Sequence, residues 1–204
     1  REKQGVMRFL LKIRGKFVSC LYDTILSVSE FNRRRNVERT FIDRNKAKVI
    51  YNGVVHNSLV DYNEEPSLID KRYFLFVGQL IPEKGIYTLI EAFRRFIAEY
   101  PEGENIILVI AGEGPESGRI SDIISNAGCS GNIRLLGGRN DVPVLMANAT
   151  AIVMPSEWPE AFGFVTAEAM MAGRPLVVSD AGALPEIVGD CALIFKKRDV
   201  EDLT

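Results

Sequence analysis

Two glutamates stand in a stretch of this chain whose residue types and spacing could bind a charged ligand. Glu160 lies in the loop Pro155–Gly163, and Glu168 lies in the helical pattern Phe164–Ala172 that follows it. The loop leaves the apolar run Ala151–Met154, which is short enough to be a buried strand. A loop that leads from such a strand into a helix offers unpaired N–H groups and the positive end of the helix dipole to an anion, above all a phosphate.

The two acids need a different neighbour, because carboxylates beside a phosphate repel it. Ionised carboxylates only accept hydrogen bonds, so hydroxyl groups suit them, as on a ribose and a sugar. A ligand with both phosphates and hydroxyl-rich rings would satisfy the whole stretch. The alternative is an amphipathic helix with a solvated Glu168 after an ordinary loop.

A cation for a diphosphate is available in Lys84, which follows Pro82 at the start of a helical pattern. With no metal in the site, lysine, arginine and helix dipoles would have to balance the diphosphate charge. The alternative is a solvated lysine in a first helical turn. No metal site is predicted, since the only Asp-x-Asp-like run is the unconvincing Asp199-Val200-Glu201.

Other nucleotide motifs are absent or incomplete. There is no GxxxxGK[ST] run, which excludes a P-loop. Gly112, Gly114 and Gly118 approach GxGxxG, but the last spacing is one residue too long and no acid ends the next strand. A dinucleotide-dependent dehydrogenase is therefore not indicated.

Composition limits the remaining classes. The 204 residues are 47% apolar, and the net charge of −2 gives no argument for nucleic acid binding. The cysteines Cys20, Cys129 and Cys191 have no metal-type spacing, so we expect reduced thiols in a cytoplasmic protein. The only histidine, His56, has no partner motif and is interpreted as a loop residue. No apolar run approaches the length of a membrane span, and no signal peptide is predicted.

Charge divides the chain into two predicted parts. Residues 1–45 hold 11 Lys and Arg against 5 Asp and Glu, whereas residues 46–204 hold 14 against 22. Within the first part, residues 3–22 alternate basic and apolar residues with a helical period. Such a helix either packs on a neighbouring domain or contacts an anionic membrane surface. A short strand, Thr24–Val28, and a helix capped by Ser29 follow it; these elements cannot make a core alone, so residues 1–45 look like the end of a domain.

The second part, residues 46–204, alternates short apolar runs with helical patterns. After a brief strand at Lys48–Tyr51 and a polar linker at 61–72, the predicted strands are Tyr73–Val77, Ile106–Ala111, Ile133–Leu136, Ala151–Met154, Leu176–Ser179 and Ala192–Phe195. The predicted helices are Gly85–Glu99, Ser117–Asn126, Val142–Asn148, Phe164–Ala172 and Pro185–Val188. Continuous apolar strands between helices predict an α/β fold, a doubly wound parallel sheet with helices on both faces. Glycine-rich loops follow several of these strands, and they should meet at the carboxyl edge of the sheet, where ligands bind.

At this level of detail the chain resembles the retaining glycosyltransferases of family 4, which have the two-domain GT-B fold. The resemblance extends from about residue 46 to the end and includes Asn52-Gly53-Val54, Val77–Gly85, Ala111–Pro115, Pro155-Ser156, Glu160–Phe164, Glu168–Met170, Gly173–Val177 and Gly182–Glu186.

The resemblance implies a nucleotide-sugar site. The residues that it places there are Gly78, Gln79, Lys84, Gly112, Gly138, Arg139, Glu160, Ala161, Phe162, Gly163, Phe164 and Glu168. Lys84 would contact the diphosphate, Glu160 the hydroxyls of the donor sugar, and Glu168 those of the ribose. The backbone of Ala161–Phe164 would meet phosphate and sugar, and the loop at Gly138 and Arg139 would lie beside the base. Gln79 stands where the family usually has arginine, which removes one charge from the diphosphate.

The function implied is transfer of a sugar from a UDP- or GDP-linked donor to a carbohydrate or lipid-linked acceptor, with retention of configuration and without metal or other cofactor. Lys84 and Glu160 would act in catalysis. Residues 1–45 would be the remnant of the acceptor domain and linker, and residues 46–204 the donor-binding domain, cut at its carboxyl end and inactive alone. The expected location is the cytoplasm, at the inner face of the membrane if residues 3–22 contact it. The alternatives are a regulatory domain that binds nucleotide sugars and a GT-B sugar-nucleotide epimerase.

Overall fold

The computed structural model describes residues 2–55, 68, 71–100, 105–126 and 131–204. Two compact units divide the chain, unit 1 at Arg1–Gly53 and unit 2 at Val54–Thr204. His56, Cys129 and nearly all of the predicted linker at 61–72 lie outside the described residues.

Unit 1 is a small helix–strand–helix–strand unit. Its elements are α1 (Glu2–Leu21), β1 (Ile25–Ser27), α2 (Glu30–Thr40) and β2 (Ala47–Val49). The N-terminal cap of α2 is Ser29, as predicted, and its hydroxyl accepts from the backbone N–H of Asn32 at 3.0 Å. In unit 1, β1 and β2 pair in parallel, and the Lys46 ammonium group donates to the Ser19 carbonyl at 2.6 Å.

The predicted boundary between residues 45 and 46 differs from the division between the two compact units, which lies after Gly53. Ile25 is the register partner of Ala47, so the second strand is held by unit 1 and the boundary falls after Gly53. Charge composition could not reveal this, because strand pairing depends on backbone hydrogen bonds and not on the charge of the side chains.

An apolar stripe lies exposed along α1. The exposed side chains are Val6, Met7, Phe9, Leu10, Ile13, Phe17 and Leu21. The opposite side of the helix packs inward at Gly15, where an added Cβ would lie 1.8 Å from the Thr40 carbonyl oxygen. No helix in the described part of the chain combines the length and the apolarity that a bilayer crossing needs.

Unit 2 is built on a parallel sheet, which has six strands among the described residues, in the order β5-β4-β3-β6-β7-β8. The strands are β3 (Arg72–Val77), β4 (Ile106–Ala111), β5 (Ile133–Gly137), β6 (Ala151–Met154), β7 (Leu176–Ser179) and β8 (Leu193–Phe195). Central strands are apolar throughout because both of their faces are covered: all residues of β4 and β6 are buried.

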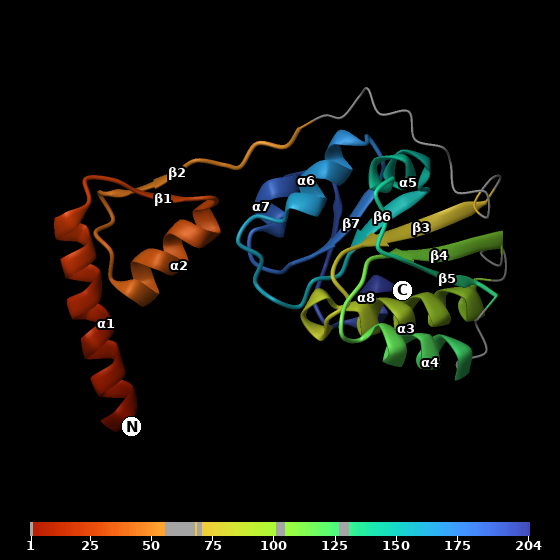
Figure 1. Ribbon diagram of the computed structural model, residues 1–204, viewed down its shortest axis with the longest axis horizontal. Helices are drawn as coiled ribbons and strands as arrows, with labels where there is room; N and C mark the ends of the chain where they lie inside the picture. The colour runs from red at the N-terminus through yellow and green to blue at the C-terminus, as the bar shows by residue number, and fades with distance from the viewer. Residues whose placement is uncertain (1, 56–67, 69–70, 101–104, 127–130) are drawn as a thin grey trace. The chain divides into compact units, whose positions relative to one another are not determined.

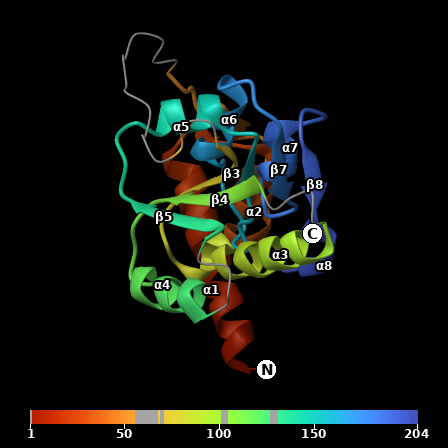
Figure 2. The ribbon, with the colours of Figure 1, turned by 90° about the vertical axis from the view of Figure 1, so that its right-hand side faces the viewer.

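Helices cover both faces of this sheet, as the alternating pattern predicted. They are η2 (Pro82–Lys84), α3 (Ile86–Glu99), α4 (Ser117–Asn126), α5 (Val142–Asn148), α6 (Phe164–Met171), α7 (Leu184–Val188) and α8 (Val200–Leu203). Figure 1 shows α3, α4 and α8 on one side of the sheet and α5 and α6 on the other, and Figure 2 shows the same layers end on. Each layer has its own apolar core, one centred on Leu108 and Ile110 and the other on Val109 and Ile152.

The alternation along β4 gives a stability prediction. Leu108 is fully buried, so Leu108→Ala should lower the free energy of unfolding by about 2–5 kcal/mol through lost burial and the cavity left behind. Leu193 of the edge strand β8 is 73% exposed, and Leu193→Ala should change the free energy of unfolding by less than about 0.5 kcal/mol. Urea unfolding of both variants measures the contrast, and equal losses would contradict the two-layer core.

Candidate nucleotide-sugar site

The candidate site lies where the order of successive strands in the sheet reverses. From β3 the chain runs outward through β4 to β5, and from β6 it runs the other way through β7 to β8, so β3 and β6 are neighbours. Ligands of doubly wound sheets bind beyond the carboxyl ends of the strands at such a switch point. Lys84 follows β3 and Glu160 follows β6, so the fold brings both to this position.

The segments after β3 and β6 are docked backbone to backbone. The Glu83 carbonyl accepts from the N–H groups of Glu157 and Trp158 at 2.9 and 3.1 Å. Gly85 has a φ of 72°, and a Cβ there would lie 1.8 Å from the Pro155 carbonyl oxygen. Only glycine permits both the left-handed backbone and this close approach.

This docking brings Lys84 and Glu160 together. The Lys84 ammonium nitrogen lies 2.6 Å from Glu160 Oε1, and the two side chains are 30% and 17% exposed. Ser156, which is buried, donates from its hydroxyl to the same oxygen at 3.0 Å. The Ser156 carbonyl in turn accepts from the Ser179 hydroxyl of β7 at 2.6 Å, so the base of the loop is fixed to the sheet.

Glu157 fixes the same loop on its other side. Its two carboxylate oxygens accept from the Thr88 hydroxyl of α3 and from the Arg198 guanidinium, each at 2.8 Å. Arg198 has a φ of 65° in the turn after β8. The loop between β6 and α6 is therefore tied to η2, β7, α3 and the turn after β8.

The N-terminus of α6 lies in the same loop. Gly163 caps the helix with a φ of 90° and provides no side-chain hydrogen bond, so the first N–H groups keep their positive potential. The Thr166 hydroxyl is fully buried, has no hydrogen-bond partner among the described residues, and lies 3.3 Å from where a Cβ of Gly163 would stand. Phe162 is buried against the exposed Phe164, with ring centroids 5.4 Å apart.

Glu168, on α6, has a different environment from Glu160. It is exposed, and no described residue forms a hydrogen bond or ion pair with its carboxylate. The eight-residue spacing thus combines a paired, largely buried acid with a solvent-facing one.

The loops after β4 and β5 lie at the same carboxyl edge of the sheet, next to the loop after β3. Gly112 has a φ of 152°, and a Cβ there would lie 1.8 Å from the Gly78 carbonyl oxygen, so these two backbones touch. The Glu113 carboxylate accepts from the Gly138 N–H at 3.1 Å. Arg139 forms a forked pair with Asp141 at 2.8 and 2.7 Å, so its guanidinium is directed to its own loop.

The structure thus unites some of the sequence-predicted residues. Lys84 and Glu160 are in contact, Gly78 and Gly112 touch, and Gln79 and Ala161 are exposed. Lys84 ends the 3₁₀ turn η2, and Gly85, in a left-handed conformation, separates it from α3. Within the described residues there is no group of three potential metal ligands.

The sequence did not reveal the residues that hold the loop. Ser156 belongs to a motif that the sequence shows, but no sequence pattern indicates a role for Glu157, Thr88 or Arg198. Their partners are 41 and 69 residues away along the chain, so no local pattern indicates them. Only knowledge of the strand order could have placed β8 and α3 beside the loop.

Fold and site together define the class. The structure of the Anabaena protein Alr3699/HepE in complex with UDP matches this chain with a TM-score of 0.81, at 23% identity over 96% of this chain and 56% of that chain. The lipopolysaccharide-biosynthesis glycosyltransferase WaaG matches with a TM-score of 0.72, at 20% identity over 87% of this chain and 50% of that one. The α/β fold is accordingly the Rossmann-like fold of GT-B glycosyltransferases.

Sequence comparison gives the family. The family model "Glycosyl transferases group 1" matches residues 61–204, so the chain belongs to this glycosyltransferase family. An uncharacterized glycosyltransferase of Methanocaldococcus jannaschii, MJ1178, is 31% identical over 92% of this chain, and the O-antigen chain mannosyltransferase B of Escherichia coli is 34% identical over 65% of it. The alignments cover 49% and 35% of those proteins, so the chain spans at most about half their length.

The Arg139–Asp141 pair makes stability depend on pH. Hydrogen bonding by the Arg139 guanidinium lowers the pKa of the Asp141 carboxyl from its ordinary 3.8, although burial opposes the shift. A lowered folded-state pKa stabilises the fold above pH 3.8, and this contribution is lost as the pH falls through the folded value. Asp141→Asn should therefore lower the free energy of unfolding at pH 7 by about 1–3 kcal/mol, and the difference from wild type should shrink below about pH 4.

Urea unfolding between pH 7 and pH 3 measures this difference. Asp122→Asn, at an exposed position of α4, is the control and should have little effect at any pH in this range. A difference at Asp141 that grows as the pH falls would contradict the assignment.

Proposed function

We propose that the full protein transfers a sugar from a UDP- or GDP-linked donor to a carbohydrate or lipid-linked acceptor with retention of configuration, and that unit 2 binds the donor. The observation that carries this proposal is the Lys84–Glu160 pair at the switch point between β3 and β6. It places a cation and a hydrogen-bond-accepting carboxylate side by side, as a ligand with a diphosphate and a sugar requires. Retention rests on the likeness of the motifs to family 4.

Different residues of the site bind different parts of the donor. Lys84 and the free N–H groups at the start of α6 stabilise the charge that develops on the leaving diphosphate. Glu160, oriented by Ser156, accepts hydrogen bonds from the sugar hydroxyls, and Glu168 accepts them from the ribose. Gly78, Gln79 and Gly112 line the diphosphate side.

The remaining predicted contacts surround these. The backbone of Ala161–Phe164 meets phosphate and sugar, and the loop of Gly138 and Arg139 lies beside the base. Catalysis in this scheme uses no metal, because Lys84 and the helix dipole provide the positive charge.

The rest of the protein supplies the acceptor site. We propose that unit 1 is the end of an acceptor-binding domain. Its two parallel strands support this, since parallel sheets are normally covered on both faces, whereas Leu26 of β1 is 59% exposed and Ile50, directly after β2, is 60% exposed. The helix α1 carries exposed basic residues beside its apolar stripe. This stripe could pack against the rest of that domain or bind an anionic membrane surface. The free thiols of Cys20 and Cys191 agree with a cytoplasmic location.

Binding of nucleotides tests the donor site. Isothermal titration with UDP, GDP and their sugars, in EDTA, should show binding of one base series, and Lys84→Met should weaken it at least about tenfold by removing the diphosphate's cation. Lys71→Met, an exposed lysine just before β3, is the matched control and should leave the affinity unchanged. No binding of any of these ligands at millimolar concentration would refute the proposal.

The ribose role of Glu168 has its own test. Glu168→Ala should weaken binding of the nucleoside diphosphate about three- to tenfold, because two hydroxyl-to-carboxylate hydrogen bonds are lost. The corresponding 2′,3′-dideoxynucleotide lacks those hydroxyls, so its affinity should not respond to the substitution. An equal loss for both nucleotides would place Glu168 away from the ribose.

A further inference from the structure

Glu160 forms an ion pair with Lys84, the cation that the proposed function assigns to the diphosphate. Lys84 Nζ lies 2.6 Å from Glu160 Oε1. We propose, resting on that function, that Glu160 is a specificity device: it makes the site select the intact sugar nucleotide against the free nucleoside diphosphate. It does so by competing for Lys84 and by repelling a diphosphate that brings no sugar.

A bare diphosphate in the site would leave the Glu160 carboxylate without its cation. The diphosphate attracts Lys84 away from Glu160, whose carboxylate then keeps the Ser156 hydroxyl at 3.0 Å as its remaining observed partner. The Glu160 side chain is only 17% exposed, so water compensates it incompletely, and a second anion stands beside it. Both effects oppose binding of the free nucleotide.

A donor with its sugar attached gives the Glu160 carboxylate new partners. Sugar hydroxyls donate to the Glu160 carboxylate and replace the hydrogen bond that Lys84 withdraws. Ser156 holds Oε1, so Oε2 is available to the ligand from the start. The intact donor therefore satisfies both members of the pair, whereas the nucleotide satisfies one.

The backbone of Glu160 prevents the loop from relieving the conflict by moving away. The Glu160 carbonyl accepts from the Ala183 N–H at 2.9 Å, and Glu160 forms a β-bridge with Gly182. A Cβ at Gly182 would lie 2.4 Å from the Glu160 N and O atoms, so the two backbones are in close contact. After sugar transfer, the product diphosphate is left beside an uncovered carboxylate, which favours its release.

The test compares two ligands on matched variants of the 204-residue chain. The ligands are the nucleoside diphosphate, UDP or GDP, that binds the wild type, and its glucose or mannose conjugate. Glu160→Gln keeps the shape and removes the charge that holds Lys84. Glu83→Gln removes the same charge one residue before Lys84, from an exposed side chain without a described partner.

Isothermal titration should give opposite changes for the two ligands. Glu160→Gln should bind the nucleoside diphosphate about 3- to 10-fold more tightly and the sugar nucleotide more weakly, so that their affinity ratio moves by at least about tenfold. Glu83→Gln should move both affinities together. In a Lys84→Met background, Glu160→Gln should gain less for the diphosphate than it does in the wild type, because the competition for Lys84 has been removed and only the repulsion remains.

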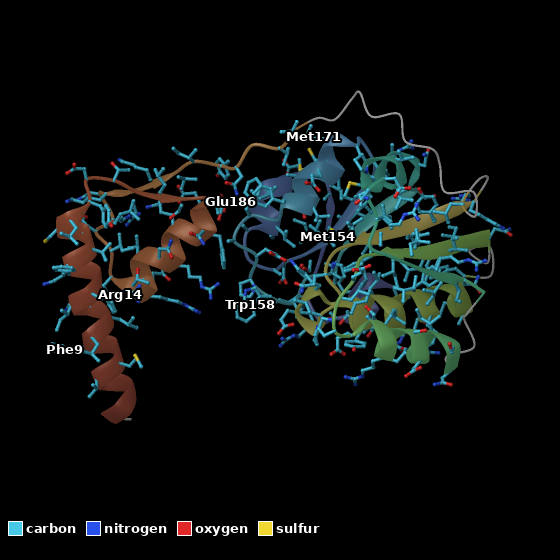
Figure 3. The ribbon with its side chains drawn as sticks, viewed as in Figure 1. Phe9, Arg14, Met154, Trp158, Met171 and Glu186 are labelled. Carbon is cyan, nitrogen blue, oxygen red and sulfur yellow. The ribbon has the colours of Figure 1, made fainter. Side chains whose placement is uncertain are left out.

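The outcomes separate this inference from the proposed function. If the wild type binds the nucleotide but Glu160→Gln leaves its affinity unchanged or lowers it, the specificity device is refuted and the donor site stands. The same holds if Glu83→Gln gives an equal gain. If the wild type binds neither ligand, the donor site itself is wrong and the inference is overturned with it. Trp158, the chain's single tryptophan, lies in the same loop at the margin of unit 2 (Figure 3), and its fluorescence gives a second binding readout and a check that each variant is folded.

Discussion

The contact between the turn after β3 and the loop after β6 is the constraint on which the site depends. One carbonyl, that of Glu83, receives two N–H groups of the loop, and Gly85 lets the Pro155 backbone approach within the space that a side chain would fill. Backbone contacts of this kind do not depend on charge, so they hold the loops in place whether or not a ligand is present. Lys84 and Glu160 can therefore be close together without being the reason that the loops meet.

This separation matters because an ion pair of this exposure stabilises a fold only modestly. If the pair were the main contact between the loops, its disruption by a ligand would loosen the site. Instead, Ser179 and Thr88 attach the loop to β7 and α3, and Arg198 attaches it to the turn after β8. The charges are thus free to exchange partners within a frame that stays fixed, which is the preorganisation that electrostatic catalysis requires.

The sequence was informative where the signal is local and regular. Continuous apolar runs predicted the strands β3 to β8 to within one residue at each end, because a strand covered on both faces has no polar side to interrupt it. Ser29 was recognised as a cap because an N-cap acts on an N–H only three residues away. The short helix α8 was missed, since four residues contain too little periodicity to detect.

The sequence was uninformative where partners are distant. Charge composition put the domain boundary at residue 45, whereas the parallel pairing of β1 with β2 moves it beyond Gly53. In the same way, Glu157 looked like any polar loop residue, although it connects α3 to the turn after β8. Such roles follow from the strand order, which local patterns do not specify.

The pair of glutamates illustrates what spacing alone can and cannot indicate. Glu168 stands eight positions after Glu160, and the sequence motif does not distinguish the environments of the two carboxylates. In the structure the first is largely buried and shares its charge with Lys84, whereas the second is exposed and unpaired among the described residues. An exposed carboxylate costs little to desolvate partly against hydroxyls, so Glu168 can add affinity for any ligand that carries a ribose. A paired one must first lose a cation, so Glu160 can add affinity only for a ligand that compensates that loss. Affinity and selectivity would thus reside in different members of the same motif.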